Sequence, residues 1–178
     1  MTYQLTEVPN TYDTVEPYSS EDMTPSHPDE NHQACLGDLQ GAQQKLEEAQ
    51  RSGDIADIKA ICNDLANRYS RHLLDSISLA NTHPDGAGLS HVALTDRFEE
   101  DFGSWEPLTQ KLLSAAHTVQ GSGWAVLAWQ PSARQLVVLP TEKYQNLSQW
   151  GVTPILALDV WKDAYYLWLL SSGPTPTR

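Results

Sequence analysis

The stretch L-D-V-W-K-D-A-Y-Y-L-W, from Leu158 to Trp168, places two carboxylates four residues apart within a cluster of aromatic side chains. It completes the apolar run P-I-L-A-L-D (154–159), which is typical of a strand, and continues with helical spacing. Asp159 and Asp163 therefore share one face of a strand-to-helix junction, where like charges repel. The pattern indicates a positive partner beside them, and a metal ion and a lysine are the two candidates.

The composition limits the classes of partner. The chain has 178 residues, is 40% hydrophobic and 19% charged, and carries a formal net charge of -12. This charge argues against nucleic acid and anionic membranes, because both need a basic face. No apolar run approaches the ~20 residues of a membrane span. The N-terminus, M-T-Y-Q-L-T-E-V-P, lacks the features of a signal peptide, so we expect a cytoplasmic protein.

The first half of the chain predicts an arm followed by a helical hairpin. Residues 1–28 contain four prolines among polar residues, which indicates an extended N-terminal arm. Apolar residues then recur at three- and four-residue steps from Asp29, are interrupted at Ser52-Gly53, and resume over residues 54–80. Two long helices joined by a short turn predict an antiparallel hairpin domain over residues 29–85.

The second half predicts a mixed layer over residues 86–170, followed by a flexible tail at 171–178. Helical patterns precede strand patterns, and the first two strands are joined by a turn that contains Pro131. The expected fold is therefore α+β: a long N-terminal α-hairpin, then an α/β layer with a small three-stranded antiparallel sheet. We expect helices at 91–100, 105–119 and 160–170, and strands at 124–129, 135–139 and 154–159.

Several motifs resemble the iron/manganese superoxide dismutase family. G-S-G-W-A-V-L-A-W (121–129), F-G-S-W (102–105) and L-D-V-W-K-D-A-Y-Y-L (158–167) are similar to its C-terminal domain, where the last motif usually reads L-D-V-W-E-H-A-Y-Y-L. H-P-D-E-N-H-Q (27–33) and N-R-Y-S-R-H-L-L (67–74) correspond, more weakly, to its N-terminal ligand motifs. The similarity runs collinearly from residue 3 to residue 167 and implies the family's fold.

The resemblance implies a mononuclear iron or manganese site, with one ion per chain. The family binds its ion through three histidines and one aspartate, and the matching positions here are His27, His72, Asp159 and Asp163. Asp163 replaces a histidine and is shorter by roughly 2 Å, so it ligates after a backbone shift, ligates through water, or does not ligate. Without it, two histidines and one carboxylate remain, which is the facial triad of non-haem iron oxygenases.

The surroundings of the expected ion also differ from the family pattern. Cys35 replaces a tyrosine, and the two places that can supply the family's active-site glutamine hold Arg68 and Tyr144. We expect Cys35, Tyr144 and Tyr69 to be active-site residues, although each could simply be a packing residue. Asp159 could likewise only cap the following helix. Losing several tuning hydrogen bonds should shift the redox potential away from that of a dismutase.

Three functions remain open. The first is a metal-dependent oxidoreductase on this scaffold, repurposed to activate O2 or superoxide or to oxidise a small organic substrate. The second is a divergent superoxide dismutase, and the third is a non-catalytic scaffold or interaction protein. The resemblance also implies a homodimer. There the family's cross-subunit glutamate–histidine bridge would become a Lys162–Asp163 pair with its charges exchanged.

Overall fold

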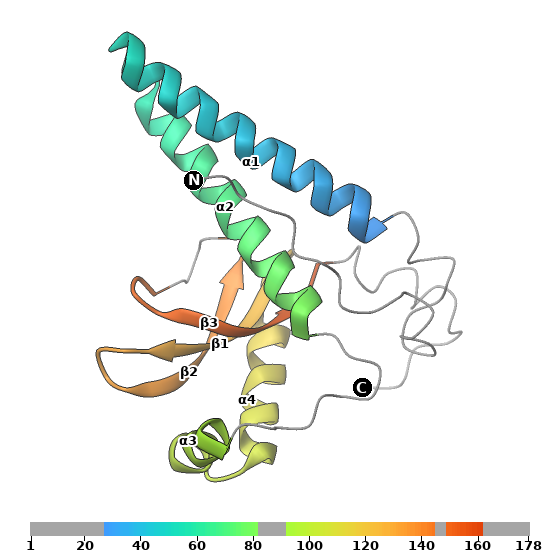
Figure 1. The fold of residues 1–178 in the computed structure, drawn as a ribbon. Coiled ribbons are helices and arrows are strands. Elements are labelled where there is room, and N and C mark those ends of the chain that lie inside the picture. Colours follow the sequence, from blue (N-terminus) through green and yellow to red (C-terminus); the bar gives the residue numbers. More distant parts are fainter. Residues whose placement is uncertain (1–26, 82–91, 145–148, 162–178) are drawn as a thin grey trace.

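A computed structural model describes the backbone of residues 27–81, 92–144 and 149–161, and the side chains of these segments except residues 27–33 and 92–93. Its elements form three layers: a helical hairpin, a small sheet and a second pair of helices (Figure 1). Residues 1–26 of the predicted arm, the tail and nearly all of the helix expected at 160–170 lie outside the described residues, whereas residues 27–28 of the arm belong to the first helix. No helix in the described segments is long and apolar enough to cross a membrane.

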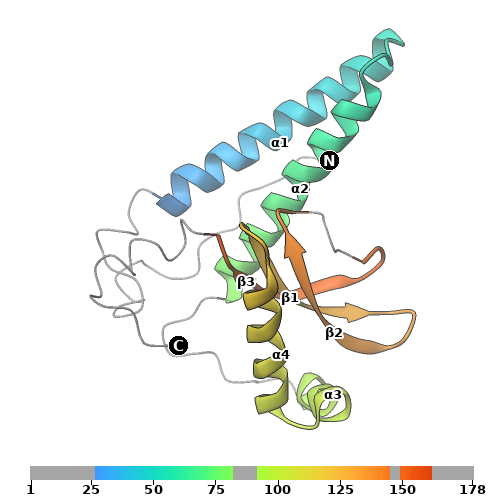
Figure 2. The same cartoon turned by 180° about the vertical axis from the view of Figure 1, so that it is seen from behind.

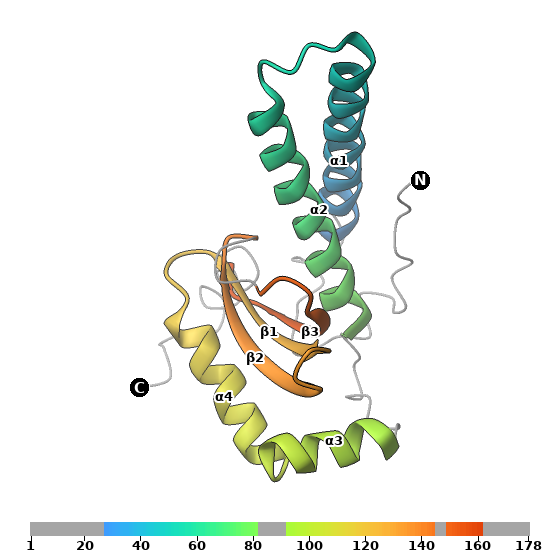
Figure 3. The same cartoon turned by 90° about the vertical axis from the view of Figure 1, so that its left-hand side faces the viewer.

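The hairpin consists of α1 (His27–Ser52) and α2 (Ile58–Asn81), which pack along each other and extend beyond the sheet (Figure 3). Gly53 ends α1 with a φ of 75°, and its N–H donates to the carbonyl of Ala49 at 3.0 Å. The break predicted at Ser52-Gly53 is therefore confirmed. The second helix begins at Ile58 instead of residue 54, because Asp54 Oδ1 accepts the N–H of Ala56 and holds the chain in a turn.

The sheet has the order β2-β1-β3, with β1 (Gly123–Gln130) antiparallel to both β2 (Gln135–Glu142) and β3 (Thr153–Asp159). The predicted three-stranded antiparallel sheet and the α+β class are confirmed. Both edges of β1 are paired because it is central, and both of its faces are covered because helices pack on each side of the sheet. Trp124, Val126 and Ala128 pack with Leu74 of α2, whereas Leu127 faces the opposite way.

The other face of the sheet is covered by α3 (Val92–Phe102) and α4 (Trp105–Thr118), which are seen from behind in Figure 2. Phe98 of α3 and Leu108 of α4 pack against Leu127 and Leu136. These helices match the two predicted at 91–100 and 105–119, and Gly103 separates them at a φ of 82°.

One end of the sheet brings distant segments together because Gly123 has no side chain. An added Cβ would lie 2.0 Å from the carbonyl oxygen of Thr141. The backbones can therefore approach closely enough for the N–H of Lys143 to bond Ser122 O at 2.8 Å. On the other side of β1, the N–H of Val160 bonds the Gly123 carbonyl at 3.0 Å. The ends of β2 and β3 thus flank the start of β1.

Candidate metal centre

Three predicted site residues lie near the end of the sheet that adjoins α2: Cys35 and Tyr144 line one cavity, and Asp159 is close enough to affect the pKa of Tyr144. Asp159 is the last residue of β3 and pairs in register with Trp124 of β1. Tyr144 follows β2, and its ring stacks on that of Trp161, with centroids 4.9 Å apart and an interplanar angle of 21°. The guanidinium of Arg71, on α2, lies 6.0 Å from the centroid of the Tyr144 ring.

His72 is suited to metal binding by its burial. Only 8% of the residue is exposed, and this burial lowers the pKa of its imidazole. The ring is therefore neutral at neutral pH, which is the protonation state that ligates a metal. His72 lies on the covered side of α2 and stays a predicted ligand.

The Asp159 carboxylate bonds the backbone two residues later, and nearly all of the helix that it was considered to cap lies outside the described residues. Its Oδ1 accepts the backbone N–H of Trp161 at 2.8 Å. A carboxylate has two oxygens and several lone pairs, so this bond is compatible with ligation of a metal. The bond to the Trp161 N–H restricts the side-chain rotation of Asp159 and fixes the direction in which its carboxylate points.

Two of the four predicted ligands cannot be placed. Asp163 lies outside the described residues, as does Lys162, and of His27 only the backbone, as the first residue of α1, is described. Within the described side chains, no group of three or more His, Cys, Asp or Glu residues could hold a metal ion. Of the four predicted ligands, only His72 and Asp159 have described side chains. Imidazole nitrogen and carboxylate oxygen are donors that suit iron and manganese, so these two fit the expected ion.

A cavity of about 170 Å³ lies between the two hairpin helices and the end of the sheet. It joins Cys35 of α1, Arg68 of α2 and Tyr144, which are three of the positions at which the sequence departs from the family pattern. Three more of its lining residues are Asp38, Asp64 and Arg71. Tyr69, by contrast, is 41% exposed and is not among the described residues that line this cavity.

Charges on the cavity wall are arranged in two groups. Arg68 pairs with Asp38 at 2.6 Å and with Asp64 at 2.8 Å, and both carboxylates are more than one-third exposed. Deeper in, Arg71 Nε lies 3.5 Å from Asp75 Oδ2, an ion pair that is too long and poorly aligned for a hydrogen bond. Burial raises the pKa of Asp75 to about 6, while Arg71 acts in the opposite direction.

The neutral polar groups of the cavity stay protonated at neutral pH. Burial raises the pKa of the Cys35 thiol to about 11, and the charge of Asp75 adds to this effect. Burial also raises the pKa of the Tyr144 phenol to about 12. Because a thiolate is the reactive form of cysteine, these surroundings favour a lining role for Cys35 over oxidation.

Sequence reasoning missed Arg71 and Asp75. Both lie on the α2 face that turns towards α1, as their effects on the Cys35 thiol show. Their i, i+4 spacing around His72 was a usable signal, since oppositely charged residues at that spacing form pairs on a helix. The pattern could not show that the pair is partly buried.

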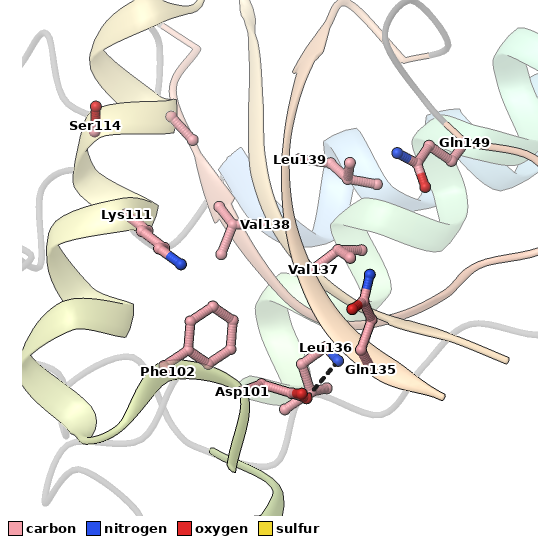
Figure 4. Close-up of a pocket in the computed structure, with 11 residues that line it drawn as sticks. Asp101, Phe102, Lys111, Ser114, Gln135, Leu136, Val137, Val138, Leu139 and Gln149 are labelled. Carbon is pink, nitrogen blue, oxygen red and sulfur yellow. Dashed lines mark hydrogen bonds between the residues drawn. The ribbon is translucent and has the colours of Figure 1, made fainter. Parts of the chain in front are cut away.

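A larger pocket of about 520 Å³ lies at the outer edge of β2 (Figure 4). Phe102 and Lys111 line it from the helical layer, and the Lys111 ammonium lies 4.8 Å from the centre of the Phe102 ring. The dashed line in Figure 4 marks the bond from the Leu136 N–H to Asp101 at 2.7 Å. This pocket contains none of the predicted site residues, so we place the chemistry at the smaller cavity.

The fold is that of an α+β protein in which a helical hairpin packs on a three-stranded sheet, with a buried histidine on the hairpin and an aspartate at the end of β3. Residues 2–81 match the alpha-hairpin domain, and residues 90–171 the C-terminal domain, of the iron/manganese superoxide dismutases. The chain belongs to this family.

Curated relatives agree with the assignment. The chain is 36% identical to the superoxide dismutase [Mn] of Haloarcula marismortui over 163 residues. The aligned region covers 92% of this chain and 79% of that protein. The chain is also 36% identical to the probable superoxide dismutase [Fe] of Bacillus subtilis, over 92% of this chain and 58% of that protein. For the superoxide dismutase [Fe] of Pyrobaculum aerophilum the identity is 34%, with coverages of 93% and 79%.

Proposed function

We propose that this chain is a metal-dependent oxidoreductase that holds one iron or manganese ion through His27, His72 and Asp159, with Asp163 as an optional fourth ligand. The observation that carries the proposal is the buried, neutral His72 on α2, the helix that packs on β3, whose last residue is Asp159. Relatives named as manganese and iron superoxide dismutases support the same choice of metals. The ion, when bound, supplies one-electron oxidation and reduction.

The surrounding side chains shape access to this site. Tyr144 is held by its stacking on Trp161 and keeps its phenolic proton, so it can donate a hydrogen bond to a molecule in the cavity. Cys35 presents a small, protonated thiol where the family has a bulky phenol. Both replacements change the volume and polarity available to a substrate. Tyr69, which is partly exposed on α2, remains a predicted active-site residue.

We propose further that the activity is directed towards O2, superoxide or a small organic substrate rather than efficient dismutation. The cavity supports this choice, because Arg68 and Tyr144 occupy both places from which the family's active-site glutamine could come. Without that amide, the redox potential is expected to move away from the value that dismutation needs. A divergent dismutase is the second candidate, and the names of the relatives favour it.

Metal analysis tests the proposal first. Full-length protein, expressed with iron or with manganese, should contain about one ion per chain, and His72→Ala should lose most of it. The matched control is His117→Ala, which removes an exposed imidazole on α4 and should retain the metal. Circular dichroism verifies that each variant is folded. Folded wild-type protein with well under one ion per chain would favour the non-catalytic scaffold.

Activity separates the two enzymatic candidates. In a xanthine-oxidase-coupled assay, the metal-loaded protein is expected to show weak dismutation. Strong dismutation at nanomolar enzyme would contradict the proposed O2- or substrate-directed activity and favour the divergent dismutase. Oxygen uptake in the presence of candidate organic substrates measures the alternative reaction directly.

The proposal includes a homodimer joined by a Lys162–Asp163 pair across the subunit interface. Both residues lie outside the described part of the chain, so the support comes from the family motif in which they stand. Lys162→Glu would place like charges together and should shift the protein towards monomer on size exclusion. An unchanged elution volume at the same concentration would count against the pair.

A further inference from the structure

Three hydrogen-bond donors near Tyr144 are buried and have no acceptor in the described part of the structure. They are the indole N–H groups of Trp124 and Trp161 and the Nε–H of Arg71. Trp124 is only 2% exposed, and it packs in one cluster with Tyr144 and Trp161. An unpaired buried donor costs about 1–3 kcal/mol, and of these three residues Arg71 lines the cavity, where a bound acceptor can satisfy it.

Arg71 is the charged member of this group, and it keeps donors for a ligand. A guanidinium has five N–H groups, and the partner at Arg71, Asp75, lies 3.5 Å away. A charge-assisted hydrogen bond would be about 2.7–2.9 Å long. Arg68, by contrast, is already engaged by two carboxylates at 2.6 Å and 2.8 Å, which makes it part of the wall.

The size and charge of the cavity limit what can bind. Its volume of about 170 Å³ equals roughly five water molecules at about 30 Å³ each. Asp38 and Asp64 also line the cavity, where Arg68 offsets part of their negative charge and solvent screens part of the rest. The deeper pair of Arg71 and Asp75 is balanced in charge. A small monoanion would therefore meet a neutral pair together with uncharged donors.

We propose that this cavity binds a small carboxylate, whose oxygens accept hydrogen bonds from Arg71 and from the Tyr144 phenol, both of which line it. Arg71 is then the residue that determines specificity. This inference rests on the proposed function and names the substrate class of the same site. A planar carboxylate suits a guanidinium because two of its N–H groups can reach both oxygens at once.

Acetate binding tests the proposal directly. Full-length protein is titrated with sodium acetate at constant ionic strength, followed by tryptophan fluorescence and by calorimetry, and the metal content of each sample is measured. We expect saturable binding to the wild type. In Arg71→Gln the affinity should fall about tenfold or more, because a hydrogen bond to a charged group is lost. The acetate affinity of Arg71→Lys should lie between those of the wild type and Arg71→Gln, since lysine keeps the positive charge but lacks the paired N–H groups of a guanidinium.

Controls separate this site from other causes. Arg51→Gln removes a guanidinium that is 78% exposed near the tip of the hairpin, and its acetate affinity should equal that of the wild type. Acetamide, which has the shape of acetate without its charge, should bind at least tenfold more weakly. No binding at tens of millimolar acetate, or equal affinity in Arg71→Gln at equal metal content, would overturn the proposal. If protein expressed with iron or with manganese retains neither ion but still binds acetate, this site is supported and the metal-dependent function is refuted.

Discussion

Asp75→Asn should make the protein more stable at neutral pH, although it removes one partner of an ion pair. Burial raises the pKa of Asp75 from 3.8 to about 6, which means that the folded state disfavours the carboxylate even with Arg71 nearby. Only 24% of the side chain is exposed, so solvent screening reduces this penalty little. An asparagine of nearly the same shape carries no charge to desolvate.

The magnitude follows from the difference between the two pKa values. Below about pH 4, Asp75 is protonated in both the folded and the unfolded chain, so it contributes no pH dependence there. Between pH 4 and 6 the unfolded chain releases its proton first, and the wild type loses stability as the pH rises. A shift of about two pKa units, at about 1.4 kcal/mol each, gives a loss of roughly 3 kcal/mol, complete above about pH 6 to 7.

Urea denaturation of both proteins at pH 4 and pH 7, in the same metal state, measures this effect. The free energy of unfolding of Asp75→Asn minus that of the wild type should increase by up to about 3 kcal/mol from pH 4 to pH 7. Asp96→Asn, which removes an exposed carboxylate on α3, should follow the wild-type curve. A difference for Asp75→Asn that stays constant or shrinks towards pH 7 would refute the reasoning.

Three further outcomes are expected. In native protein, a thiol reagent should modify exposed Cys62 but not buried Cys35, and after unfolding it should modify both. Rapid labelling of two thiols in the native state would contradict the burial of Cys35. Gly123→Ala should cost about 3 kcal/mol or more in thermal unfolding, because its Cβ would meet the Thr141 carbonyl at 2.0 Å. Asp101→Ala should cost about 1–3 kcal/mol, since it loses an arginine partner and the N–H of the edge strand; wild-type stability would contradict this.

Local patterns were sufficient to predict the elements of the fold. The apolar steps on both sides of Gly53 specify two helices and a turn, because that glycine adopts a left-handed conformation that other residues avoid. The run W-A-V-L-A-W is apolar on both faces, which agrees with the central position of β1. The start of α2 was misplaced, because the Asp54 side chain bonds the backbone two residues later and delays the helix.

The candidate site was predicted only in part. The family motifs indicated His72, Asp159, Cys35, Arg68 and Tyr144, and the structure brings the last three to one cavity. Motif matching compares each position with its counterpart in the family. It gives no information on the contacts of a residue that lacks such a counterpart. The roles of the residues adjoining this cavity therefore had to come from packing.

The sequence by itself determined the hairpin, the strand order along the chain and the residue types offered to a metal, because these depend on periodicity and on local motifs. Only the tertiary structure decided that Arg71 and Asp75 form a partly buried pair and that Trp124 and Trp161 lack acceptors. Burial and hydrogen-bond satisfaction depend on which elements meet. Here that meeting is set by α1 packing on α2 and by the close approach of three strand ends at Gly123.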